Sequence, residues 1–213
     1  MKNEEFTTSH IDEAFIDLHQ LSTTYDPHFL SERDADHSFK LLENDPYLKQ
    51  DRIRMMGQWI QEPRLTAWYG DPDKSYKYSG KIMVPKPWTP ILLELKHKIE
   101  HRIIEMGFNV EFNSVLINKY RNGLDSQGWH SDDEKELGPD PVIASLSLGA
   151  TRTFQIRLKD DHSKKISASL LHGSLLVMSG RSQSLSQHRV PKINPKNAAM
   201  TPSRINLTFR TIR

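Results

Sequence analysis

The sequence predicts an α+β protein in which helical elements come first and a β-rich core follows. Two observations carry this prediction. In two segments before residue 108, apolar residues recur at three- and four-residue intervals, the spacing of an amphipathic helix. After Phe112 the spacing changes to two, and short alternating segments follow one another with Gly, Pro, Asn or Ser often between them. Several short strands of this kind are typical of an all-β barrel or jelly roll.

The first helix is expected between about residues 30 and 44, ending before Asp45-Pro46, because the residue before proline disfavours helical backbone. The second is better marked. Thr89 suits the N-cap, Pro90 the first turn and Gly107 the position just after the last turn. One buried stripe runs between them: Ile91, Leu92, Leu95, Ile99 and Ile103.

The first strand of the core is expected after Phe112. Leu116, Asn118 and Tyr120 share one of its faces, and Val115 and Ile117 the other. Further strands are expected near residues 142–148, 152–158, 166–170, 174–179 and 203–211. The 213 residues favour one domain, over 51–213, preceded by an N-terminal extension over 1–50 of unclear role. The first thirty residues are polar and mixed, so we expect a loosely packed arm.

Composition excludes several classes of protein. With 36% hydrophobic and 26% charged residues the chain is neither disordered nor fibrous. No window approaches 18 consecutive apolar residues, so no membrane partner is expected. The absence of Cys excludes disulfides, a thiolate nucleophile and a Cys-based zinc site. The first residues lack the apolar stretch of a secretory leader. We therefore expect a protein that is not secreted: cytoplasmic if bacterial, nuclear if eukaryotic.

The net charge of +2 hides an asymmetry between two parts of the chain. Residues 1–150 hold 17 Lys and Arg and 25 Asp and Glu, a net charge of −8. Residues 151–213 hold 12 bases and two acids, a net charge of +10. Such a basic segment favours a polyanionic partner, although a solvated basic face would have the same composition.

One segment has the pattern of a metal site. His130 and Asp132 are two residues apart, so in extended backbone their side chains point to the same side. His188 follows 58 residues later, beyond several predicted strands. Two histidines and one carboxylate form the facial triad of non-haem Fe(II) oxygenases. Zinc accepts the same ligand types, so a zinc hydrolase is an alternative at this point.

The C-terminal strand separates these two possibilities. In the segment 204–210, Arg204, Asn206, Thr208 and Arg210 occupy one face, and three apolar residues occupy the other. The two arginine Cα atoms lie about 20 Å apart, so guanidinium groups folding inward could hold the two ends of a short dicarboxylate. A zinc hydrolase has no use for two inward arginines. The alternative is an edge strand with solvated arginines.

Taken together, these motifs resemble the AlkB family of Fe(II)/2-oxoglutarate nucleic-acid demethylases, in particular its animal DNA- and RNA-repair homologues. The resemblance runs from about Met55 to Arg213. The motifs that carry it are Asn118-Lys119-Tyr120, His130-Ser131-Asp132, His188 and the segment 204–210. Pro63-Arg64, Trp68-Tyr69-Gly70-Asp71 and the segment 76–80 resemble the family's nucleotide-recognition lid, and the segments 141–150 and 172–175 resemble its core strands. The resemblance implies a double-stranded β-helix (jelly-roll) core with N-terminal and flanking helices and a lid at about 55–85.

The resemblance also implies roles for individual residues. His130, Asp132 and His188 would bind iron. The 2-oxoglutarate site would comprise Asn118, Tyr120, Arg204, Asn206, Thr208 and Arg210, with Arg204 and Tyr120 on the distal carboxylate and Arg210 nearer the metal. Around the substrate base the implied residues are Tyr78, which would stack on it opposite His130; Glu134 beside it; and Met56, where the duplex-specific homologue has an aromatic finger. Near the lid, Arg64 and Ser79 are expected to position the lesion strand, and Tyr76 is a further expected substrate contact.

These substrate roles have simpler structural alternatives. Tyr78 could be core packing, Glu134 a solvated acid or a helix cap, and Met55-Met56 buried filler. The physical chemistry of the lesion nevertheless matches the implied roles. A methylated cationic base costs less to extrude than a sound base, and a nearby carboxylate favours the cationic form.

The implied function is oxidative demethylation of 1-methyladenine and 3-methylcytosine in DNA, and potentially RNA, which is direct-reversal repair of alkylation damage. The reaction would consume Fe(II)-bound 2-oxoglutarate and O2 and release formaldehyde, succinate and CO2. Single- and double-stranded DNA both remain open as substrates, and we expect a monomer. The alternatives are the same chemistry on RNA or on a protein side chain, and a non-catalytic nucleic-acid-binding module.

Overall fold

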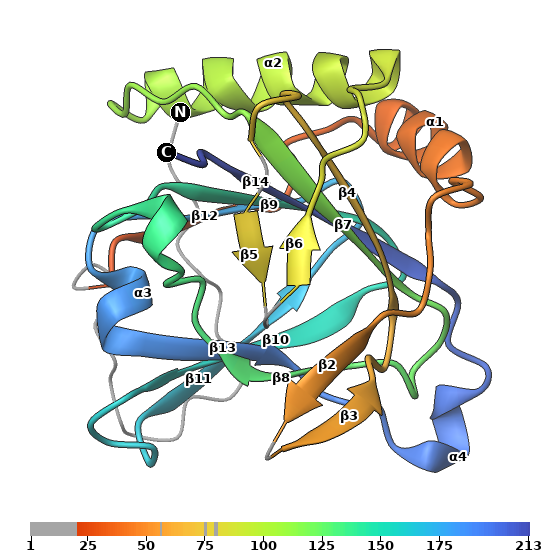
Figure 1. Ribbon diagram of the computed structural model, residues 1–213. Coiled ribbons are helices and arrows are strands. Elements are labelled where there is room, and N and C mark those ends of the chain that lie inside the picture. Colours follow the sequence, from red (N-terminus) through yellow and green to blue (C-terminus); the bar gives the residue numbers. More distant parts are fainter. Residues whose placement is uncertain (1–20, 56, 75, 79–80) are drawn as a thin grey trace.

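Two antiparallel sheets form the core of the molecule in a computed structural model that describes residues 21–55, 57–74, 76–78 and 81–213 (Figure 1). The larger sheet has six strands in the order β1-β12-β9-β14-β7-β4. The bounds of its strands are Thr23–Asp26 (β1), Leu65–Gly70 (β4), Ser114–Tyr120 (β7), Ile143–Gly149 (β9), Leu175–Met178 (β12) and Arg204–Arg210 (β14). This arrangement, together with the second sheet, confirms the jelly-roll prediction.

The smaller sheet has four strands in the order β11-β10-β13-β8. Its strands are Gln127–His130 (β8), Arg152–Leu158 (β10), Lys165–Leu170 (β11) and Ser186–Val190 (β13). The sequence predicted β10 and β11 but missed β8 and β13, which are short and carry polar side chains on both faces. Two short α-helices, Ser182–Leu185 (α3) and Pro195–Ala198 (α4), and a 3-10 turn at Lys135–Leu137 complete this part of the chain.

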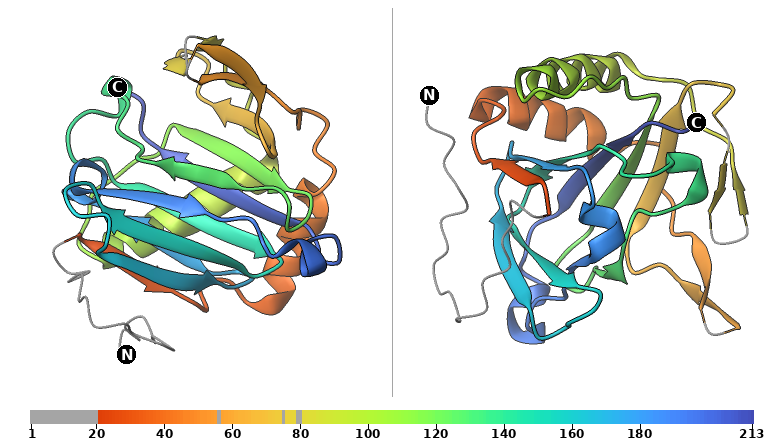
Figure 2. Two further views of the ribbon diagram at one scale, coloured as in Figure 1. Left: turned by 90° about the horizontal axis from the view of Figure 1, so that it is seen from below. Right: turned by 90° about the vertical axis from the view of Figure 1, so that its left-hand side faces the viewer.

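Two longer helices cover the outer face of the six-stranded sheet (Figure 2). The first, α1, spans Glu32–Leu42, and its N-cap Ser31 accepts a hydrogen bond from the main-chain NH of Asp34. The second, α2, spans Pro90–Glu105. Thr89 occupies its N-cap position but makes no side-chain capping bond, and Gly107 follows the helix with a φ of +90°. Both predicted helices are therefore confirmed.

The inner strand β14 separates the apolar core from the interior of the jelly roll. It pairs with β7 on one side and β9 on the other, and all seven of its residues are buried. Ile205, Leu207 and Phe209 pack in the core under the helices, as the alternation predicts. The alternative of an edge strand with solvated arginines is excluded.

The prediction of a loosely packed N-terminal arm is wrong for the part of it that the structure describes. β1 pairs with β12, and Leu21 and Leu30 are buried. The Tyr25 hydroxyl donates to the carbonyl of Ser169 and accepts from the main-chain NH of Leu171, so it links β1 to the other sheet. Isolated apolar residues in a polar segment gave no periodic signal, although Leu21 and Leu30 each belong to a buried core cluster.

The predicted lid at 55–85 needs one correction. Two hairpins project on one side of the molecule (Figure 2), β2–β3 (Arg52–Met55 and Gln58–Gln61) and β5–β6 (Tyr76–Tyr78 and Lys81–Met83). The segment between them, however, is β4, which pairs with β7 and buries Trp68 and Tyr69. The middle of the predicted lid is thus part of the six-stranded sheet. Within the described ranges no helix is both long and apolar enough to cross a membrane.

Two neighbouring isoleucines on α2 differ in exposure, and this difference predicts how much each side chain contributes to stability. Ile103 is 0% exposed and Ile104 is 58% exposed. We expect Ile103→Ala to lower the free energy of unfolding by about 2–5 kcal/mol, because it leaves a cavity in the core. Ile104→Ala, the matched control, should stay within about 0.5 kcal/mol. Urea unfolding of both variants measures the difference, and equal effects would contradict this packing of α2.

Candidate active site

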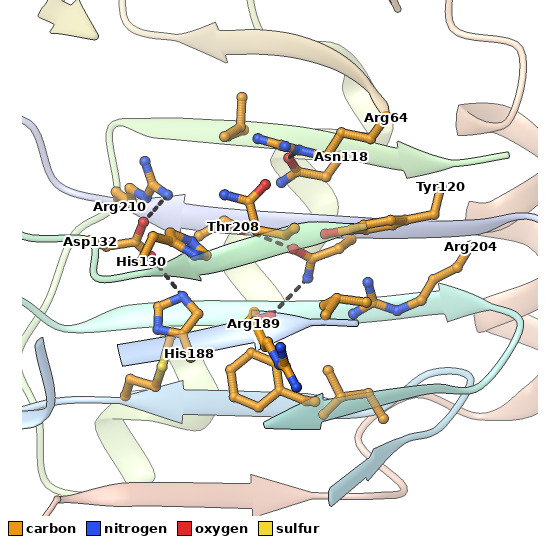
Figure 3. Close-up of a pocket in the computed structure, with 18 residues that line it drawn as sticks. Arg64, Asn118, Tyr120, His130, Asp132, His188, Arg189, Arg204, Thr208 and Arg210 are labelled. Atoms are coloured by element: carbon orange, nitrogen blue, oxygen red, sulfur yellow. Dashed lines mark hydrogen bonds and ion pairs between the residues drawn. The ribbon is translucent and has the colours of Figure 1, made fainter. Parts of the chain in front are cut away.

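A pocket opens between the two sheets, lined by side chains from both (Figure 3). At one end lie His130 and His188 with Asp132, and toward the other end lies Arg204. Side chains of β14 and β7 form the wall between them. The sequence analysis assigned most of this wall to one site, and the fold brings those residues together.

Antiparallel pairing of β8 with β13 places the two histidines side by side. His188 lies directly opposite His130 in the register, and their ring centroids are 4.2 Å apart. Asp132 follows two residues after His130, and its Oδ2 lies 3.9 Å from His188 Nε2. One donor atom from each of the three residues lies within 4.8 Å of the other two. This set is close enough to share one metal ion.

Each imidazole is held by its surroundings. His130 Nδ1 lies 2.9 Å from the carbonyl of Gly128, which fixes that nitrogen as the donor and leaves Nε2 for a metal. The His188 ring stacks on Phe154 with centroids 5.3 Å apart. His188 itself is buried.

The segment that carries Asp132 is tied to α3 and to the start of β13. The main-chain NH of Asp132 donates to Gln183 Oε1 at 2.9 Å, and Ser131 Oγ donates to the carbonyl of Ser186 at 2.7 Å. Arg210 Nη2 donates to Asp132 Oδ1 at 2.6 Å. The carboxylate therefore has one oxygen on Arg210 and the other directed at His188.

The protonation states of the three residues suit metal binding. Burial, with a smaller contribution from the neighbouring His130, lowers the pKa of His188 to about 3. Burial also lowers the pKa of His130. Burial by itself would raise the pKa of Asp132, but Arg210 and the two histidines hold it below its usual range. At neutral pH the cluster is two neutral imidazoles and one carboxylate, the form that binds a divalent ion.

Arg204 lies toward the other end of the pocket and is 1% exposed. Its Nη2 donates to Ser147 Oγ at 2.9 Å, whereas Nε and Nη1 have no acceptor in hydrogen-bond geometry among the described residues. Its guanidinium carbon lies over the ring of Tyr120, 5.2 Å from the centroid, because the two residues are cross-strand partners. A buried guanidinium with two unused donors fits an anionic group of a small molecule.

Between the two ends, amides and hydroxyls form a connected polar layer. Asn206 Nδ2 donates to Ser145 Oγ at 2.7 Å, and Thr208 Oγ1 donates to Asn206 Oδ1 at 3.0 Å. Asn118 is the cross-strand partner of Asn206. These four side chains are all buried, so the layer is pre-formed rather than assembled from mobile surface groups.

Arg64 lies inside this pocket rather than on an outer lid. It is 4% exposed, and its Nε donates to Asn118 Oδ1 at 2.7 Å. Its Nη2 donates to Glu62, a carboxylate that is itself buried. The structure thus places Arg64 against the predicted 2-oxoglutarate residues, where the sequence analysis had expected a contact with the lesion strand.

Glu134 is half-buried, and burial raises the pKa of its carboxyl group above the usual range. It occupies the N-cap position of the 3-10 turn without making a side-chain capping bond, and its Oε2 has no hydrogen-bond partner in the described part of the chain. Neither alternative, a solvated acid or a capping residue, describes it. The side chains of Tyr76 and Tyr78, and residues Ser79 and Met56, lie outside what the structure describes.

Sequence reasoning missed three side chains that hold the site together: Ser145, Ser147 and Gln183. Ser145 and Ser147 alternate with apolar residues in β9, and this period of two was a signal that one face of the strand lines the pocket. Gln183 gave no comparable signal, because its contact with the main chain of Asp132 joins residues 51 positions apart.

The buried state of His188 predicts how the stability of the metal-free protein depends on pH. Its pKa is about 3 in the folded protein and 6.5 in the unfolded chain, so the unfolded state binds the extra proton between these values. Stability should therefore fall as pH falls below about 6.5, with up to about 1.4 kcal/mol per pH unit from this one group. Urea unfolding in the presence of a chelator, from pH 7.5 to pH 4.5, measures this slope.

His188→Gln should have a shallower slope than the parent protein. His162→Gln, which removes an exposed histidine in the turn between β10 and β11, should leave the slope unchanged. An identical slope in the parent and His188→Gln would show that this imidazole is not held neutral by burial.

Residues 22–210 match the sequence profile of the 2OG-Fe(II) oxygenase superfamily. The solved structure "The structure of OsALKBH1" aligns with a TM-score of 0.64 and 19% identity, over 89% of this chain and 96% of that one, which supports the fold.

Among curated relatives, alpha-ketoglutarate-dependent dioxygenase alkB homolog 3 of Bos taurus is 45% identical over 195 residues, covering 87% of this chain and 64% of the relative. The Homo sapiens protein named DNA oxidative demethylase ALKBH2 is 38% identical, and the alignment covers 76% of this chain and 61% of that relative. The Arabidopsis thaliana protein of the same name is 32% identical, and the alignment covers 92% of this chain and 68% of that relative. The chain thus spans less than two thirds of the two mammalian relatives. The profile match extends from β1 to the end of β14, and the aligned relatives carry the AlkB name: the chain belongs to the 2OG-Fe(II) oxygenase superfamily and, within it, to the AlkB family.

Proposed function

We propose that this protein demethylates N-alkylated bases in nucleic acid, using the Fe(II), 2-oxoglutarate and O2 of its superfamily. The observation that carries the proposal is the pocket itself, which holds a facial set of two neutral histidines and one carboxylate at one end and a buried guanidinium with unused donors at the other. Relatives named DNA oxidative demethylase suggest the substrate class.

His130, Asp132 and His188 would hold the iron. When bound together with 2-oxoglutarate and O2, this group supplies the oxidation of an N-methyl to an N-hydroxymethyl group, which then breaks down to formaldehyde and the restored base, while 2-oxoglutarate leaves as succinate and CO2. Arg210 holds one oxygen of Asp132 and compensates its charge in a buried site. The hydrogen bond from the main-chain NH of Asp132 to the Gln183 side chain fixes the position of the residue that carries the carboxylate.

The remaining wall would bind 2-oxoglutarate. Arg204 and Tyr120 would take the distal carboxylate, because Arg204 has two unused donors there. Arg210 lies near the metal-binding end, beside Asp132. Asn118, Asn206 and Thr208 lie on the wall between the two ends and would contact the chain of the co-substrate.

Glu134 and the projecting hairpins would receive the base. A half-buried carboxylate with an unpartnered oxygen favours a cationic methylated base over the neutral parent. Tyr78 on β5 would supply the stacking face, with His130 on the other side. RNA is the second substrate to test, since the same recognition suits an unpaired base in either polymer. We propose that the protein acts as a monomer.

A turnover assay tests the proposal directly. The purified protein is supplied with Fe(II), ascorbate and 2-oxoglutarate, and with single-stranded DNA, duplex DNA or RNA carrying 1-methyladenine or 3-methylcytosine. Mass spectrometry then reads the loss of a methyl group. We expect His130→Ala to abolish turnover, because it removes one of three metal ligands, and His162→Ala to leave it unchanged, because that histidine is exposed and outside the pocket.

The outcomes separate the parts of the proposal. Consumption of 2-oxoglutarate without base repair would leave the oxygenase chemistry in place and remove alkylated bases as substrates. No consumption in the parent protein, with iron bound, would favour a non-catalytic binding module.

Substitutions of Arg204 test the co-substrate site. Arg204→Ala should raise the KM for 2-oxoglutarate about 10- to 150-fold, the equivalent of losing a charged hydrogen bond of about 1.5–3 kcal/mol. Arg204→Lys keeps the charge but not the two-pronged geometry, so its KM should be intermediate. Steady-state kinetics with 2-oxoglutarate as the varied substrate measures both. An unchanged KM in Arg204→Ala would contradict the assignment.

A further inference from the structure

A further buried guanidinium lies behind the wall of the pocket. Arg152, the first residue of β10, is 2% exposed. Its Nη2 donates to the carbonyls of Asp125 at 2.9 Å and Pro191 at 2.7 Å, and its Nη1 donates to the carbonyl of Asn122 at 3.1 Å. One side chain thus ties the loop that follows β7 to the segment that follows β13.

The charge on this group is not neutralised by an ion pair. All three acceptors are neutral main-chain carbonyls. The nearby carboxylate of Asp125 is engaged by Arg121, whose Nε and Nη2 donate to its two oxygens at 2.8 Å each. Over the described residues, neither Arg152 nor Arg204 has a carboxylate within ion-pair distance. Two buried cations without a counter-ion are costly unless an anion joins them.

Both cations meet at one aromatic ring. The guanidinium carbon of Arg152 lies over the ring of Tyr120, 5.5 Å from its centroid, and that of Arg204 lies 5.2 Å from the same centroid. Tyr120 is 3% exposed and lines the pocket. Cation–π contact in a desolvated site is worth more than at the surface, so Arg152 restricts where the ring can lie.

We propose that Arg152 is a positioning residue for the co-substrate: it fixes the ring of Tyr120 and adds a second buried positive charge at the Arg204 end, so that the site selects a chain with a distal carboxylate. The inference rests on the proposed function, because it assumes that 2-oxoglutarate reaches from the metal to Arg204. Arg152 does not touch the co-substrate; it acts through Tyr120 and through its charge.

The test compares two metal-chelating anions. Both 2-oxoglutarate and oxalate bind a metal through adjacent oxygens, but oxalate is too short to reach Arg204. Calorimetry on the Mn(II)-loaded protein without O2 gives the Kd of each. We expect Arg152→Met to raise the Kd for 2-oxoglutarate about tenfold, the equivalent of about 1.4 kcal/mol, and to leave that for oxalate within about twofold. Thermal unfolding of each variant reports whether it is folded.

Three further variants separate positioning from general support of the fold. Arg121→Met removes an equal charge from the loop that Arg152 contacts, but the Arg121 side chain is 42% exposed, so neither Kd should change more than about twofold. Arg152→Lys keeps the positive charge but lacks the planar guanidinium group, so its Kd for 2-oxoglutarate should lie between those of the parent protein and Arg152→Met. In a Tyr120→Leu background, Arg152→Met should have a much smaller effect, because the ring through which it acts is gone.

Each outcome decides between these roles. Equal weakening of 2-oxoglutarate and oxalate in Arg152→Met and Arg152→Lys would mean that Arg152 only supports the fold, and unchanged binding in both would also overturn the inference. If Arg152→Met does not fold, the ratio of the two Kd values in Arg152→Lys decides. If the parent protein binds oxalate but not 2-oxoglutarate, the proposed function itself is overturned. If parent and variants bind 2-oxoglutarate equally well, only the role of Arg152 is lost.

Discussion

The register of β14 between β7 and β9 is the constraint on which the rest of the structure depends. With Arg204 opposite Tyr120 and Asn206 opposite Asn118, every second side chain of β14 enters the pocket and the others pack under the helices. A shift by one residue would place Ile205, Leu207 and Phe209 in the pocket and drive two guanidinium groups into an apolar core. The core and the site therefore specify the same pairing, and neither can change without the other.

The fold shows where the basic residues of the C-terminal segment lie. The basic C-terminal segment suggested a surface for a polyanion, yet three of its arginines are buried: Arg204 and Arg210 line the pocket, and Arg152 lies against Tyr120 in its wall. Part of the asymmetry therefore lies in the interior of the protein and not on its surface. Each guanidinium is held differently: Arg210 by a carboxylate, Arg204 by a hydroxyl and Arg152 by carbonyls.

Where one face of a segment was polar and the other apolar, the sequence predicted the element well. This applies to β7, β10 and β14 and to the stripe of α2, since in each the period follows from local geometry. Family resemblance assigned Trp68-Tyr69-Gly70-Asp71 to the lid, and no local pattern opposed this assignment. Leu65–Gly70 (β4) is buried along nearly its whole length and so shows no alternation, and its partner β7 lies about fifty residues away. The two histidines and the carboxylate of the metal site, and the two arginines of β14, were predicted from spacing and from family resemblance. Gln183 and Arg152 were not, because their roles come from tertiary contacts with main-chain groups.

The hydroxyl of Tyr25 has a consequence beyond joining the two sheets. β11 is an outer strand of the four-stranded sheet, and the carbonyl of Ser169 and the NH of Leu171 lie at that edge. The Tyr25 hydroxyl pairs with both groups, because it donates a hydrogen bond to the carbonyl and accepts one from the NH. These are the main-chain groups that a strand from another molecule would need for pairing. At this end of β11, Tyr25 therefore occupies two positions with which an incoming strand would pair, and a chain beginning after β1 would leave both without this partner.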